Sequence, residues 1–179
     1  MTERALDVVV YGATGFTGRQ AASWLAKNGG SGLRWGIAGR SREKLEAIRQ
    51  GLGSDVPIVV ADSDDPESVR RMAAGTRVVL STAGPFARYG DAVVDACVAH
   101  RTDYVDITGE TAWVRRIIDR HHARAASEGT RIVPMCGFDS VPSDLGAYVV
   151  VRALQERGLV PAAVRGTFSL RGGLNGGTL

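Results

Sequence analysis

The chain has 179 residues, of which 44% are hydrophobic and 23% charged, a composition typical of a globular protein and unlike that of a disordered or collagen-like one. The 22 Lys and Arg and 19 Asp and Glu residues leave a formal charge of +3, and the basic residues are scattered, so charge does not point to nucleic acid. No secretory signal and no apolar run of the roughly 20 residues that a membrane span needs is visible. Two cysteines without paired spacing, Cys97 and Cys136, favour reduced thiols in a cytoplasmic protein.

Short β-branched runs that alternate with amphipathic segments predict an α/β fold, a Rossmann-type doubly wound parallel sheet. The expected strands are residues 7–11, 33–38, 58–61, 78–81, 104–107 and 132–136. The expected helices are residues 17–27, 42–50, a segment from residue 66, 89–100, 111–127 and 142–156. The strand order of this fold is 3-2-1-4-5-6, which brings the loops after the first and fourth strands together.

The pattern changes after Gly158, where Pro161 and a further predicted strand over residues 163–170 precede a glycine-rich segment. We therefore expect residues 1–158 to form the Rossmann-type, dinucleotide-binding domain and residues 159–179 to begin a second, truncated domain. On this interpretation the chain is the N-terminal part of something longer. The alternative is a frayed natural tail.

The strongest motif is a glycine-rich turn that directly follows the first predicted strand and opens the first predicted helix. Its three glycines allow a tight turn, close approach of a pyrophosphate to the backbone, and close packing of the helix on the strand. The free N–H groups and the positive end of the helix attract that pyrophosphate. We therefore predict dinucleotide binding, the alternative being a purely structural turn. The residues are Gly12, Ala13, Thr14, Gly15, Phe16, Thr17 and Gly18.

The second strand leads to Arg40 and Ser41, where an NAD-binding protein usually places an acid for the ribose 2′-hydroxyl. A guanidinium and a hydroxyl suit a 2′-phosphate instead, so NADP(H) is the predicted cofactor, and Arg42 or Lys44 could assist. The alternative is a solvated arginine at a helix start. After the third strand, Asp62 is expected near the adenine amino group, or it is a turn or cap acid.

The fourth strand leads into small residues that the predicted strand order places beside the glycine turn. We expect them to form a backbone surface against the nicotinamide half of the cofactor, unless they are a plain strand-to-helix turn. They are Thr82, Ala83, Gly84 and Pro85.

The loops after the fifth and sixth strands, residues 106–110 and 136–144, bring further polar groups to the same edge of the sheet. Within the second loop, Asp139, Ser140 and Ser143 are equally suited to cap a helix and to line a site. One residue can do both, so the two interpretations stay open.

Candidates for a proton-donating acid at this edge are Tyr89 and Asp139, with residues outside this chain as the alternative source. No metal site is predicted, because the neighbours His121 and His122 point to different faces of a helix.

Five ordered segments together resemble the saccharopine dehydrogenase-like oxidoreductases, and within them the branch of trans-acting enoyl reductases. The segments are residues 10–18, 38–40, 81–86 with 89–90, 104–110 and 137–144. The resemblance implies an NADP(H)-dependent enzyme that reduces an enoyl thioester of a lipid or polyketide intermediate, with a small-molecule or carrier-linked acyl substrate. It also implies that residues 159–179 begin a second α+β domain, through which a homodimer could form. The alternative from a different class is a non-catalytic NADP-binding sensor or scaffold.

Overall fold

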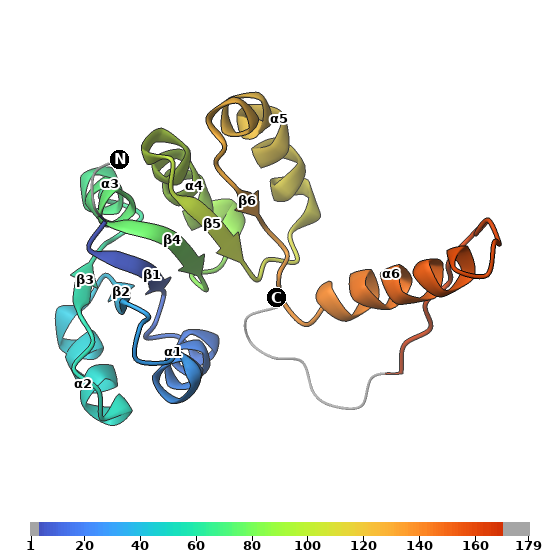
Figure 1. The fold of residues 1–179 in the computed structure, drawn as a ribbon. Coiled ribbons are helices and arrows are strands. Elements are labelled where there is room, and N and C mark those ends of the chain that lie inside the picture. Colours follow the sequence, from blue (N-terminus) through green and yellow to red (C-terminus); the bar gives the residue numbers. More distant parts are fainter. Residues whose placement is uncertain (1–3, 170–179) are drawn as a thin grey trace.

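The computed structural model describes residues 4–169, which contain a six-stranded sheet in the order β3-β2-β1-β4-β5-β6 (Figure 1). All five neighbouring pairs of strands are parallel. The strands are β1 (Leu6–Tyr11), β2 (Trp35–Gly39), β3 (Ile58–Val60), β4 (Thr76–Ser81), β5 (Asp103–Asp106) and β6 (Ile132–Val133). The predicted fold class and strand order are therefore confirmed.

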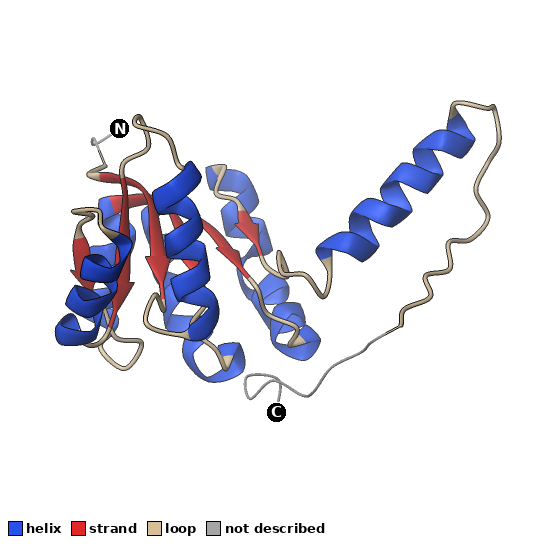
Figure 2. Cartoon of the chain, turned by 90° about the horizontal axis from the view of Figure 1, so that it is seen from below, coloured by secondary structure: helices blue, strands red, loops and turns tan. Residues whose placement is uncertain are grey.

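Helices cover the sheet on both faces (Figure 2). Among the described residues, five helices do so: α1 (Phe16–Asn28), α2 (Arg42–Leu52), α3 (Pro66–Gly75), α4 (Phe86–His100) and α5 (Thr111–Glu128); α6 (Val141–Gln155) follows them in the chain. One core cluster joins a face of the sheet to residues of α3, α4 and α5, and the other joins the opposite face to residues of α1 and α2. Successive residues of a strand face opposite sides, which is why Val9 belongs to the first cluster and Val10 to the second.

The carboxyl ends of the parallel strands lie at one edge of the sheet, so the loops that follow them gather there. Their arrangement depends on β1, which pairs with β2 on one side and β4 on the other. The connections that leave β1 and β4 pass to opposite faces of the sheet. In this type of fold a crevice opens between two such connections.

Two elements near the C-terminal end differ from the prediction. The sixth strand ends at Val133 rather than at residue 136, because Pro134 has no N–H for the ladder and Met135 adopts a positive φ of 63°. The predicted strand over residues 163–170 is wrong for residues 163–169, which have no regular secondary structure; Leu170 lies outside the described residues. Helix α6 carries this segment away from the sheet, so no described strand lies beside it to pair with.

Helix α6 confirms the predicted helix over residues 142–156 but extends away from the sheet (Figures 1 and 2). None of its residues is buried, and its apolar side chains Leu145, Tyr148 and Val149 are more than half exposed. Among residues 4–169, no helix is long and apolar enough to cross a membrane.

Candidate functional site

The glycine turn after β1 is built from glycines that the backbone requires. Gly12 has a positive φ of 83°, and a Cβ there would lie 2.9 Å from the backbone nitrogen of Ala83. A Cβ on Gly18 would lie 2.2 Å from the carbonyl oxygen of Gly12. The first glycine therefore permits the turn against the fourth-strand loop, and the last permits α1 to pack against the turn.

Within residues 4–169, no acidic side chain caps the N-terminus of α1. Its N-cap is Gly15, which offers no side chain, and its first turn contains no acidic residue. A Cβ on Gly15 would meet only the carbonyl oxygen of Gly12, at 3.3 Å. The arrangement of bare helix N-terminus and approachable backbone fits the pyrophosphate of a dinucleotide.

Thr82 joins the loop after β4 to the glycine turn. Its backbone N–H and its hydroxyl both donate to the carbonyl oxygen of Tyr11, at 2.9 and 3.0 Å. The hydroxyl is thus engaged within the protein, while Gly84 and Pro85 are exposed. The structure brings the two loops together as predicted, and it gives Thr82 the task of fixing one to the other.

Arg40 and Ser41 lie together between β2 and α2. Arg40 is exposed, and its side chain has no hydrogen bond or ion pair with any described residue. The hydroxyl oxygen of Ser41 caps α2 by accepting the N–H of Lys44 at 3.3 Å, which leaves the hydroxyl hydrogen available for another acceptor. An unpaired guanidinium beside a helix N-terminus suits a phosphate group.

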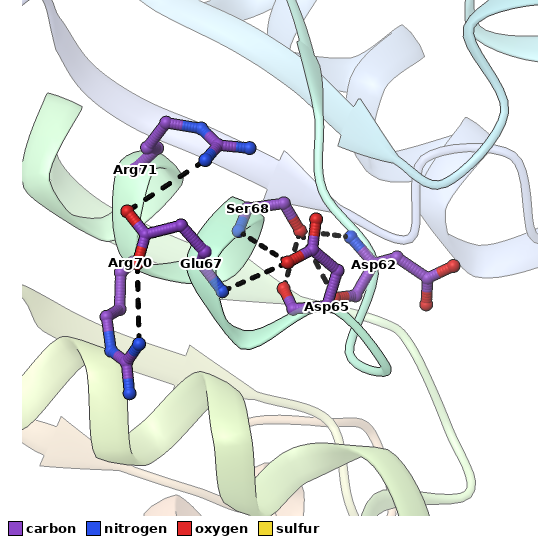
Figure 3. A network of polar contacts seen from close by, with 6 residues as sticks. All are labelled: Asp62, Asp65, Glu67, Ser68, Arg70 and Arg71. Carbon is purple, nitrogen blue, oxygen red and sulfur yellow. Dashed lines mark hydrogen bonds and ion pairs between the residues drawn. The ribbon is translucent and has the colours of Figure 1, made fainter.

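Asp62 belongs to a closely hydrogen-bonded loop ahead of α3 (Figure 3). Its backbone N–H donates to the Ser68 hydroxyl at 2.9 Å, and its carboxylate accepts the N–H of Asp64 at 3.1 Å. The N-cap of α3 is Asp65, which accepts the N–H groups of Glu67 and Ser68 at 3.2 and 3.3 Å. Asp62 is therefore a turn acid, and its side chain points away from the Ser68 hydroxyl (Figure 3). A contact with adenine stays a prediction.

The loop after β5 is organised by the buried carboxylate of Asp106. One of its oxygens accepts the N–H groups of Thr108 and Met135, at 3.0 and 2.9 Å, and the other accepts the hydroxyl of Tyr104 at 2.8 Å. Burial raises the pKa of Asp106, and these hydrogen bonds oppose that rise. One acid thus holds the loops after β5 and β6 together.

Glu110 supplies a cap that the sequence analysis did not identify. Its carboxylate oxygens accept the backbone N–H groups of Phe86 and Ala87, at 2.7 and 2.8 Å, at the start of α4. The N-cap of α4 itself is Pro85, which has no side chain able to accept a hydrogen bond. The only sequence signal was the lack of a local cap, and nothing local indicates which distant acid fills it.

The two candidates for a catalytic acid lie on different elements. Tyr89 is half-buried on α4, with the Arg88 guanidinium carbon 5.1 Å from its ring centroid. Asp139 is exposed, and its Oδ2 would lie 4.0 Å from a Cβ on Gly109, beside the loop after β5. No hydrogen bond or ion pair joins these two candidates.

The segment after β6 departs from one expectation, that a polar side chain there caps a helix. Ser140 is the N-cap residue of α6, but no side chain makes the capping hydrogen bond. Cys136 is exposed, whereas Cys97 is buried and burial raises the pKa of its thiol. Among residues 4–169 there is no group of three or more His, Cys, Asp or Glu residues that could hold a metal ion.

Comparisons with known proteins agree with this arrangement. Residues 8–133 match the family model described as the saccharopine dehydrogenase NADP binding domain. Trans-acting enoyl reductases of Mycobacterium tuberculosis and Mycobacterium leprae are both 47% identical, over 87% and 86% of this chain, which covers 38% and 37% of those proteins. A further Mycobacterium tuberculosis relative is 45% identical over 99% of this chain.

Among solved structures, apo saccharopine dehydrogenase (L-Glu forming) from Saccharomyces cerevisiae superimposes with a TM-score of 0.70 at 20% identity. The match covers 86% of this chain and 32% of that one, and it confirms the fold. The chain spans less than half the length of the curated relatives that it matches. The matched family is described by its NADP binding, which confirms the predicted cofactor class, and the chain belongs to the saccharopine dehydrogenase NADP-binding-domain family.

Proposed function

We propose that the chain holds NADP(H) with the pyrophosphate against residues 12–18 and the start of α1. The observation that carries this proposal is the bare N-terminus of α1 after β1, together with Arg40 after the neighbouring strand β2, whose guanidinium pairs with no described residue. A dinucleotide phosphate would supply the anion that α1 lacks, and a 2′-phosphate would supply the partner that Arg40 lacks.

The remaining contacts follow from the edge of the sheet at which each loop lies. Arg40 and Ser41 would bind the 2′-phosphate, with Arg42 or Lys44 assisting, and Asp62 would face the adenine. The backbone of residues 83–85, of which Gly84 and Pro85 are exposed, would lie against the nicotinamide half. A forked, charge-assisted contact is worth on the order of 1.5–3 kcal/mol, or roughly a tenfold to hundredfold preference for NADPH over NADH.

We further propose that the protein containing this chain is an NADP(H)-dependent enoyl reductase acting on a thioester-linked lipid or polyketide intermediate. The names of the mycobacterial relatives support this activity over a non-catalytic sensor or scaffold. The bound cofactor would supply the hydride, while this chain would orient it at the carboxyl edge of the sheet. Tyr89 and Asp139 are the candidates within the chain for the acid that protonates the substrate carbon next to the thioester carbonyl.

Three linked predictions belong to the same proposal. A small-molecule or carrier-linked acyl group would be the substrate. Residues 159–179 would begin a second domain through which a homodimer could form. The protein would be located in the cytoplasm.

The test is a fluorescence titration of the 179-residue chain with NADPH and with NADH, repeated for Arg40→Asp. Because the 2′-phosphate is the only difference between the two ligands, NADPH should bind at least about tenfold more tightly, and the variant should lose that preference. Arg70→Asp is the matched control, since Arg70 is an exposed arginine on α3 that pairs with Glu67. Equal binding of the two ligands by the unmodified chain would refute the role of Arg40.

A further inference from the structure

A continuous chain of hydrogen bonds runs from the end of β5 to the start of α4. Asp106 accepts the N–H of Thr108, the Thr108 hydroxyl accepts the N–H of Glu110 at 3.0 Å, and the Glu110 carboxylate accepts the first two N–H groups of α4. Asp106 and Thr108 are buried and Glu110 is half-buried. The three residues stand at alternate positions within five residues of sequence, so the segment is a compact brace between two crossovers.

The far end of this brace meets the loop that follows β4. Phe86, whose N–H donates to the Glu110 carboxylate at 2.7 Å, comes directly after Pro85. Residues 83–85 are the backbone surface assigned above to the nicotinamide half. At the other end of that loop, Thr82 is tied to Tyr11. The loop is therefore fixed at its beginning by β1 and at its end by Glu110.

We propose that Glu110, held in place by Thr108 and Asp106, is a positioning residue for the nicotinamide half of the cofactor. This inference rests on the proposed function, because it assumes that NADP(H) binds at this edge. Glu110 would not contact the reacting atoms. It would set the position of residues 83–85, and it would also fill the N-terminus of α4 with a protein carboxylate.

The carboxylate at the start of α4 also affects where the phosphates of the cofactor bind. Two helix N-termini, those of α1 and α4, follow neighbouring strands of the sheet. Because the carboxylate of Glu110 already satisfies two N–H groups of α4, a dinucleotide phosphate finds free donors and a positive helix end at α1 alone of this pair. Glu110 would thus direct the phosphates to one side of the crevice and the nicotinamide to the other.

The proposal separates the two halves of the cofactor, and a matched pair of ligands tests it. NADPH contains the nicotinamide, and 2′-phospho-ADP-ribose has the same phosphates and adenine without it. For Glu110→Ala we expect NADPH affinity to fall about tenfold while 2′-phospho-ADP-ribose affinity changes by less than about twofold. A general loss of structure would instead weaken both ligands together.

Two further variants keep the test independent of folding. Thr108→Val removes the acceptor for the Glu110 N–H without changing side-chain shape greatly, and it should weaken NADPH selectively but less than Glu110→Ala does. Glu67→Ala is the matched control, because Glu67 lies in the first turn of α3 and makes only exposed ion pairs. It should alter neither affinity.

The outcomes distinguish this proposal from the one on which it depends. If the unmodified chain binds neither ligand, the proposed function fails. If it binds both ligands and Glu110→Ala weakens both equally or neither, the cofactor site stands and the positioning role of Glu110 is overturned. A selective loss of NADPH with Glu110→Ala and, to a smaller extent, Thr108→Val supports it.

Discussion

Helices α1 and α4 both follow a strand at the same edge of the sheet, yet their N-termini are completed in opposite ways. At α1 the N-cap is Gly15, no acid lies in the first turn, and no side chain caps the helix. At α4 the N-cap is Pro85, but the carboxylate of Glu110 reaches across from the next crossover and accepts two N–H groups.

A helix start that binds a ligand differs from a purely structural one in what surrounds its N-terminus. Every helix begins with N–H groups that lack partners, so a bare N-terminus alone says little. In this chain the bare N-terminus coincides with a backbone too close-packed for side chains at Gly12 and Gly18. It also coincides with an Arg40 that follows the neighbouring strand β2 and pairs with no described residue. These features are expected together where a bound ligand, rather than a side chain, satisfies the N-terminus of a helix.

The largest expected effect comes from closing the space in which α1 meets the glycine turn. Gly18→Ala would place a Cβ 2.2 Å from the Gly12 carbonyl oxygen, so α1 or the turn must move. We expect the free energy of unfolding to fall by about 1–3 kcal/mol and NADPH binding to be lost. Thermal unfolding and a fluorescence titration measure the two effects.

The control for this variant is Gly51→Ala, since Gly51 lies within α2 and a Cβ there would meet nothing within 4 Å. It should keep or slightly raise stability, because alanine favours a helix over glycine. If Gly18→Ala behaved like Gly51→Ala, the close packing of α1 on the turn would be wrong.

A second variant converts the open N-terminus of α1 into a filled one. Gly15→Asp places a carboxylate at the N-cap, where the backbone is extended with φ −75° and ψ 170°. Its Cβ, 3.3 Å from the Gly12 carbonyl oxygen, requires a shift of only a few tenths of an ångström. Without ligand the stability should rise by a few tenths of a kcal/mol, while NADPH affinity should fall about tenfold or more because like charges repel. Higher stability together with weaker NADPH binding would support a ligand phosphate at the N-terminus of α1, and unchanged binding would contradict it.

A third variant empties a helix start that has only a structural role. Asp65→Ala removes the cap of α3 and should lower the free energy of unfolding by about 1 kcal/mol (Figure 3). NADPH affinity should stay within about twofold, since Asp65 serves the helix rather than the ligand. A larger loss of affinity in the titration would show that the loop containing Asp62 matters more for binding than we infer.

The smallest effect is expected at the opposite edge of the sheet, where Asp7 pairs with Arg34. Hydrogen bonds from Arg34 hold the pKa of Asp7 below its ordinary value. A lowered acid pKa stabilises the fold above the unfolded pKa of about 3.9, and this contribution is lost as the pH falls through the folded pKa. The unfolding midpoint of Asp7→Asn should therefore lie slightly below that of the unmodified chain at pH 7 and converge with it in acid. A constant difference across pH would contradict this.

Local patterns were sufficient to predict the strand order, the helices and the glycine turn. Runs such as residues 8–10 are apolar at successive positions because helices cover both faces of the sheet, and that signal is local. The incorrect part is the strand over residues 163–169, where β-branched residues suit a strand but no described neighbour exists to pair with. Strand propensity without a partner strand does not make a strand.

The candidate site was less predictable, because its organisation depends on contacts between distant residues. Glu110 and Phe86 are 24 positions apart, and only the tertiary fold places the carboxylate at the start of α4. Similarly, the sequence placed Thr82 in a backbone surface beside the glycine turn, and only the structure shows that its hydroxyl donates to the carbonyl of Tyr11, 71 positions away. Residue type and strand phase predicted which edge each group lies on, and not which partner it takes.

The central claim is that a ligand anion completes α1 while Glu110 completes α4. The most direct test follows the backbone amide signals of the isotope-labelled 179-residue chain by NMR during titration with 2′-phospho-ADP-ribose. We expect large, saturating shifts for Phe16, Thr17 and Gly18, together with Arg40 and Ser41, and little change for Phe86 and Ala87. Saturating shifts at Phe86 and Ala87 without any at residues 16–18 would contradict the account.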